Sequence, residues 1–176
     1  MSEAAVRAYA VEKHFGSATL SRWLAYPPAD RDALLELAVQ LRLGENQLRD
    51  VLDDVGAIVA RRGGGVTGLL SDEAVRGAVV RSPGRNPAIR ALKQALRRLR
   101  YPQLSNAEQR LAELGRALRL PAGVRVELPE NLDGDAIALT LRGRTAGELR
   151  AQARAAAACL QGEALDEMFA VLEGLR

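Results

Sequence analysis

Residues 124–128 have the sequence Val-Arg-Val-Glu-Leu, and residues 136–142 have the sequence Ala-Ile-Ala-Leu-Thr-Leu-Arg. Both stretches alternate in character, and a period of two predicts β-strands because successive strand side chains point to opposite faces. Residues 129–135, Pro-Glu-Asn-Leu-Asp-Gly-Asp, separate them and are rich in turn-forming types. The other patterned stretches have helical periodicity. The chain is therefore predicted to be mainly α, with a small α+β unit in its C-terminal part.

Two capping boxes place a helix on each side of these strands. Ser105-Asn106-Ala107-Glu108 would begin the first helix, and Thr145-Ala146-Gly147-Glu148 the second. A Ser or Thr followed three residues later by Glu satisfies the free N–H groups at the start of a helix. A terminal helix is expected at residues 163–175. We therefore expect residues 104–176 to form a helix-strand-strand-helix domain with one further helix.

A sheet of two strands is too small to be stable alone. A symmetric dimer that pairs two hairpins edge to edge would complete it, which predicts a homodimer formed through residues 104–160. Alternatively, the strands lean on the helices of their own chain, and the protein is a monomer.

The N-terminal part is predicted to be a helical bundle, with a domain at residues 1–62. Apolar residues at helical spacing over 34–41 and 48–58 flank a tight turn at Gly44. Two helices joined in this way resemble a helix-turn-helix, whose second helix enters the major groove of DNA. The candidate base-reading residues at the start of that helix are Asn46, Gln47 and Arg49, because Asn, Gln and Arg can make bidentate contacts with base edges.

Two features favour the alternative, a pair of packed helices with no role in DNA reading. Arg42 occupies the position at which the turn usually has glycine. Asp50, Asp53 and Asp54 lie on the second helix and would repel phosphates.

The excess positive charge lies in one segment. Residues 74–107 hold eight Lys and Arg and no acidic residue, whereas both flanks are mildly acidic. We expect residues 63–103 to comprise a hinge at Gly63-Gly64-Gly65 and a basic helix at 88–101. Such a concentration of charge attracts a polyanion, and double-stranded DNA is the partner we expect. The candidate phosphate-binding residues are Arg81, Arg85, Arg90, Lys93, Arg97, Arg98 and Arg100.

The same helix could instead dock an acidic surface. That surface would belong to a partner protein, or to the chain's own helix with Asp50, Asp53 and Asp54. In that case the protein would be an interaction or adaptor module.

Other classes of function find no support in the sequence. A single histidine, a single cysteine and the lack of nucleophile-elbow, P-loop or dinucleotide motifs predict a non-enzyme without a metal or cofactor. No apolar run approaches the roughly 18–20 residues of a membrane span. A cytoplasmic protein is therefore expected, associated with the nucleoid if it binds DNA.

With these elements placed, the chain resembles part of the ParB/Spo0J family of chromosome-partition proteins. The resemblance lies in residues 36–44 with the following helix, in residues 121–127 through the second strand, and in residues 145–149. It implies a prokaryotic DNA-binding protein with a C-terminal dimerisation domain. The family's N-terminal Gly-Glu-Arg-Arg box is lacking, so the resemblance implies no CTP binding.

A hydrophobic core follows from the same periodicities. The residues expected to be buried are Leu34, Leu37, Leu41, Leu48, Val51, Leu92, Leu96, Leu99, Leu111, Leu114, Val126, Ile137, Leu139 and Leu149.

Overall fold

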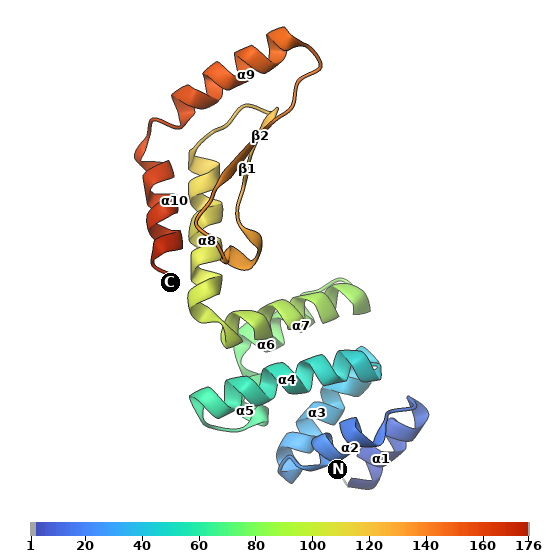
Figure 1. Ribbon diagram of the computed structural model, residues 1–176. Helices are drawn as coiled ribbons and strands as arrows, with labels where there is room; N and C mark the ends of the chain where they lie inside the picture. The colour runs from blue at the N-terminus through green and yellow to red at the C-terminus, as the bar shows by residue number, and fades with distance from the viewer. Residues whose placement is uncertain (1–2, 176) are drawn as a thin grey trace. The chain divides into compact units, whose positions relative to one another are not determined.

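The computed structural model describes residues 3–175 and confirms a mainly helical fold with one small antiparallel hairpin (Figure 1). The chain divides into two compact units, unit 1 at residues 1–100 and unit 2 from Tyr101 onward. The described helices of unit 1 are α1 Glu3–Glu12, α2 Ser17–Leu24, α3 Pro28–Leu41, α4 Glu45–Arg62, α5 Val66–Ser71, α6 Glu73–Val80 and α7 Arg85–Arg100. Unit 2 contains α8 Pro102–Ala117, β1 Val124–Glu127, the 3-10 turn η1 Glu130–Leu132, β2 Ala138–Leu141, α9 Ala146–Cys159 and α10 Glu163–Glu173.

Unit 1 is built around the apolar stripes of α3, α4 and α7. Leu34, Leu48, Leu52, Leu92 and Leu96 are all fully buried in one cluster. These positions recur every three to four residues, so each helix presents a continuous apolar face to the others.

An aromatic group closes the N-terminal end of this core. Trp23 is fully buried, and its ring lies edge-on to that of Tyr9, with centroids 6.1 Å apart. The Tyr9 hydroxyl lies within hydrogen-bonding distance of two acceptors, the carbonyl oxygens of Ala38 at 2.8 Å and Leu43 at 2.9 Å. Helix α1 is thereby anchored to the turn that follows α3.

The three glycines expected to be a hinge lie inside unit 1. Gly63 and Gly64 have φ values of 74° and 84°, which glycine adopts without strain. They reverse the chain after α4, and α5 then packs on both α3 and α4. The segments 1–62 and 63–100 thus share one core, and the sequence pattern did not indicate α5.

In unit 2 the hairpin forms where the alternating pattern predicts it. Val124 pairs with Leu141 and Val126 with Leu139, so these four side chains share one face of the sheet. A separate apolar cluster joins Leu111, Leu114 and Leu118 of α8 to Met168 and Leu172 of α10.

Several boundaries differ from the sequence-based expectation. Helix α8 begins at Pro102, so Ser105 lies within it and does not cap it. Helix α7 begins at Arg85, three residues early, because proline is tolerated in the first turn of a helix and Pro87 does not block it. The second capping box is confirmed at its first residue, since the Thr145 hydroxyl accepts a hydrogen bond from the Glu148 N–H at 3.1 Å.

The predicted core is confirmed more fully in unit 1 than in unit 2. In unit 2, Val126, Ile137 and Leu139 are only partly buried, and Leu149 is 40% exposed, contrary to expectation. Helix α9 buries only Ala156 among its residues. The hairpin and α9 therefore leave apolar surface uncovered.

None of the helices within residues 3–175 combines the length and apolarity that a membrane span requires.

Candidate nucleic-acid interface

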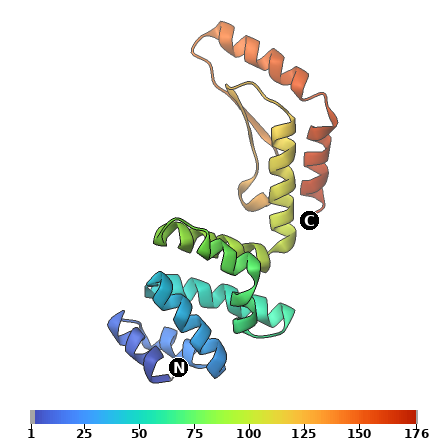
Figure 2. The same cartoon turned by 180° about the vertical axis from the view of Figure 1, so that it is seen from behind.

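Helix α7 lies beside α4 in both views of the molecule (Figures 1 and 2). Two ion pairs join them: Lys93 Nζ lies 2.6 Å from Asp50 Oδ2, and Arg100 Nη1 lies 2.8 Å from Asp54 Oδ1. The third aspartate of α4, Asp53, pairs with Arg22 of α2. All three aspartates that argued against DNA binding are therefore paired with cations of unit 1.

The remaining cations of α7 face outward. At about 100° per residue, Arg90 and Arg97 lie about 60° further round the helix than Lys93 and Arg100, and Arg98 lies beyond them. All three of these arginines are exposed. Among residues 3–175, the guanidinium groups of Arg90 and Arg98 have no hydrogen-bond or ion-pair partner. The basic helix therefore has one side that serves the fold and one side that faces solvent.

Arg85, at the start of α7, holds the turn between α3 and α4. Its Nε donates to the Leu41 carbonyl at 2.8 Å, and its Nη2 donates to the Arg42 carbonyl at 2.9 Å. The same Nη2 lies 3.3 Å from Gln47 Oε1, which also accepts from the Gly44 N–H at 3.2 Å. One guanidinium thus satisfies carbonyls at the end of α3 and fixes the first turn of α4.

The start of α4 has one side turned inward and one turned to solvent. On the inner side, Glu45 Oε1 accepts from the Thr19 hydroxyl at 2.7 Å and from the Gly16 N–H at 2.9 Å. These two hydrogen bonds hold the pKa of Glu45 below its usual value. On the outer side, Asn46 and Arg49 are exposed, and Arg49 donates to Asn46 Oδ1 at 3.2 Å. Asn46 and Arg49 therefore lie on the surface of the helix-turn-helix-like pair.

The ten candidate residues separate into two groups. Arg85, Gln47, Lys93 and Arg100 link separate elements of unit 1. Asn46, Arg49, Arg90, Arg97 and Arg98 are exposed, and Arg49 bonds to Asn46 on the same helix. Arg81 is also exposed and lies 3.6 Å from Glu73. Sequence reasoning missed Arg22, which pairs with Asp53, and Arg61, which donates to the carbonyls of Leu99 and Arg100. Such pairs join residues distant in the sequence, and no local pattern marks them.

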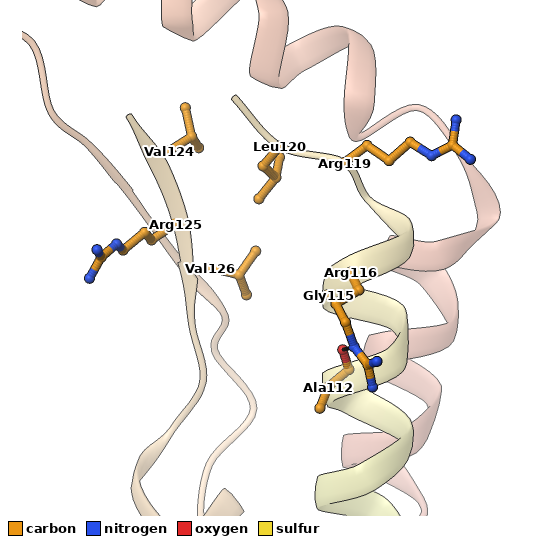
Figure 3. A pocket seen from close by; sticks show the side chains of 8 residues that line it. All are labelled: Ala112, Gly115, Arg116, Arg119, Leu120, Val124, Arg125 and Val126. Atoms are coloured by element: carbon orange, nitrogen blue, oxygen red, sulfur yellow. Dashed lines mark hydrogen bonds between the residues drawn. The ribbon is translucent and has the colours of Figure 1, made fainter. Parts of the chain in front are cut away.

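Unit 2 has a different kind of surface. A cleft of about 440 Å³ lies between α8 and β1, and Leu120, Val124 and Val126 line it. Arg119 and Arg125 also border the cleft, but their side chains point away from it (Figure 3). Val126 and Ile137 pack against the apolar cluster of α8 and α10, so the hairpin closes on α8 only in part and the cleft stays open beside this contact.

The two units also differ in charge. Residues 1–100 carry 16 Lys and Arg against 11 Asp and Glu, a net charge of +5, whereas residues 101–176 carry 9 against 11, a net charge of −2. The positive charge that would attract a polyanion thus belongs to the unit that contains the helix-turn-helix-like pair.

Comparison of the chain with models of protein families, with curated proteins and with solved structures gave no match. The resemblance to the ParB/Spo0J family stays a prediction.

Proposed function

We propose that the protein binds double-stranded DNA through unit 1, as a homodimer held together by unit 2. In this proposal the exposed arginines of α7 contact phosphates, and Asn46 and Arg49 at the start of α4 contact base edges.

The pairing of the three α4 aspartates carries the proposal. Unpaired, these carboxylates would repel a DNA backbone lying along α4. Paired with Lys93, Arg100 and Arg22, they contribute little net charge to that surface. The arginines on the outer side of α7 then dominate the local field, and such a field favours a polyanion.

The proposal retains fewer phosphate contacts than the sequence predicts. Lys93 and Arg100 are engaged with α4, and Arg85 is engaged with the turn, so we assign them to the fold. Arg90, Arg97 and Arg98 are exposed and are the main phosphate contacts that we propose. Three contacts correspond to a slope of about −3 in log affinity against log salt, at about −0.9 per phosphate.

Paired substitutions test the surface. Arg90→Gln with Arg98→Gln should weaken binding to duplex DNA roughly tenfold or more and reduce the salt slope by about two, without loss of thermal stability. Fluorescence anisotropy with a labelled duplex measures the binding, and circular dichroism measures the stability.

The matched control is Arg7→Gln on α1 with Arg62→Gln at the end of α4, two positions outside both the α7 surface and the proposed dimer surface. These two arginines are also exposed, and the change in net charge is the same. We expect this control to bind DNA like the wild type. If both double variants lost affinity equally, net charge and not the α7 surface would govern binding, and the proposed site would be wrong.

The alternative, an interaction module, also has support in the structure. Two of the six cations of α7, Lys93 and Arg100, dock the acidic side of α4, as an internal partner would require. An acidic protein partner would use the same outer arginines. If the arginine variants leave DNA binding unchanged, an acidic partner becomes the better hypothesis.

The homodimer rests on the uncovered surface of unit 2. The two-stranded sheet has partly buried apolar residues on its inner face, an apolar cleft beside β1 and an exposed Leu149. A second copy of the same unit could cover this surface and add strands to the sheet. Such a dimer would place two DNA-binding units on one particle and raise its affinity for adjacent sites.

A further inference from the structure

Arg42 has a backbone conformation that disfavours its own side chain. It follows α3 with φ 47° and ψ 51°, in the left-handed region where glycine is the usual residue. The conformation is imposed by the turn. The Leu43 N–H donates to the Ala38 carbonyl at 2.9 Å, and the Arg42 carbonyl accepts from Arg85. An arginine here costs folding stability that a glycine would not.

No contact of the Arg42 side chain offsets that cost. The residue is exposed, and its guanidinium has no hydrogen-bond or ion-pair partner among residues 3–175.

A cation at the end of a helix can also interact favourably with the free carbonyls there. At the end of α3 this role is already filled, because the guanidinium of Arg85 binds the carbonyls of Leu41 and Arg42. Helix capping therefore does not explain why position 42 is arginine.

The position of Arg42 suggests what the side chain is for. Its carbonyl and the side chain of Gln47 bind the same nitrogen of Arg85, so Arg42 lies next to the first turn of α4. Asn46 and Arg49 are exposed on that turn. Residues in disfavoured backbone regions cluster at functional sites, so this conformation beside exposed polar residues supports a role in binding.

We infer that Arg42 is a DNA-phosphate contact that anchors the start of α4 on the duplex. This inference rests on the proposed DNA-binding function and adds to it a residue at the turn. Because φ at this position is fixed by the turn, the Cα–Cβ bond of Arg42 has a fixed direction, and a phosphate contact made by its side chain would help to set the register of α4.

The test separates stability from binding. Arg42→Gly should unfold at the same temperature as the wild type or higher, because glycine adopts the left-handed conformation freely. It should nevertheless bind duplex DNA about three- to tenfold more weakly, with the salt slope reduced by about 0.9. Asparagine also tolerates the left-handed conformation and carries no charge. Arg42→Asn should therefore show the same thermal stability, DNA affinity and salt slope as Arg42→Gly.

His14→Gly is the backbone control, since His14 is an exposed residue of unit 1 with φ 55°, in the same left-handed region. It should also retain or gain thermal stability, but it should leave DNA affinity unchanged.

Wild-type affinity and salt slope in Arg42→Gly, with the wild type itself binding DNA, would overturn the inference and leave the proposed function intact. Loss of affinity together with lowered thermal stability in both Arg42 variants would also overturn it, because Arg42 would then serve the fold. If the wild type bound no DNA, the proposed function would fail, and the inference with it.

Discussion

Asp30 lies in the first turn of α3, and its buried carboxylate joins this helix to the start of α5. One oxygen, Oδ1, accepts from both the N–H and the hydroxyl of Thr67, each at 2.8 Å. An acidic residue in the first turn of a helix commonly caps that helix, but α3 begins at Pro28 and the carboxylate of Asp30 bonds to another helix. A local pattern can identify a capping residue without identifying the helix that it caps.

The hydrogen bonds of Asp30 make stability depend on pH. Burial raises the pKa of Asp30, but the hydrogen bonds from Thr67 outweigh it, so the pKa lies below the ordinary value of 3.8. The folded state thus binds the proton less tightly than the unfolded state. The resulting stabilisation is complete above about pH 4 and is lost as pH falls through the folded-state pKa.

We predict that Asp30→Asn lowers the free energy of unfolding by about 1–2 kcal/mol at pH 7, through loss of a charge-assisted acceptor. The difference from wild type should narrow as pH falls below about 4. Urea unfolding at pH 7 and at pH 3, followed by circular dichroism, measures it. If the two proteins differed in free energy of unfolding by the same amount at pH 7 and at pH 3, the charge of the Asp30 carboxylate would not contribute to stability.

At the scale of elements, the ion pairs between α4 and α7 differ in burial. Side-chain exposure is 33% for Arg100 and 19% for Asp54, against 42% for Lys93 and 49% for Asp50. Exposed pairs are screened by water and contribute little, so the Arg100–Asp54 pair should contribute more than the other.

A double-mutant cycle tests this ranking. For Arg100→Gln and Asp54→Asn we predict a coupling free energy of up to about 1 kcal/mol that falls in high salt. The control cycle uses Glu3→Gln and Arg7→Gln, an exposed pair within α1, where we expect little or no coupling. Equal coupling in the two cycles would contradict a special role for the α4–α7 contact.

The helices and the hairpin could be predicted because their signals are local. Periodicity identified α3, α4 and α7, and the alternating residues identified β1 and β2. Helix α5 was missed because its six residues are too few to show a period and follow three glycines. The sequence does not show which cations of α7 pair with α4 and which face solvent, because that depends on which side of α7 is covered by α4.

At the scale of the whole molecule, unit 2 shows the limit of sequence reasoning about burial. Leu149 has the spacing of a core residue and yet is 40% exposed in the single chain. Periodicity identifies an apolar face, but it does not say whether the face is covered by the same chain or by another.

We predict that the protein is a dimer in solution, with a molar mass about twice the 18.9 kDa of the chain. Leu149→Glu should shift it toward the monomer, because a carboxylate buried at a subunit interface is costly. Light scattering coupled to size-exclusion chromatography measures the mass. Val11→Glu, a similar change at a residue of unit 1 that is 74% exposed, should leave the mass unchanged. A wild-type mass of one chain would contradict the dimer.

The central claim is that the outward cations of unit 1 bind the DNA backbone. Its most direct test is a titration of the wild-type protein into labelled duplex DNA of random sequence, by fluorescence anisotropy at about 50 mM and about 200 mM salt. With three or four phosphate contacts, affinity should fall roughly 50- to 150-fold between the two conditions. Absence of binding at the lower salt concentration, or binding that does not change with salt, would contradict the claim.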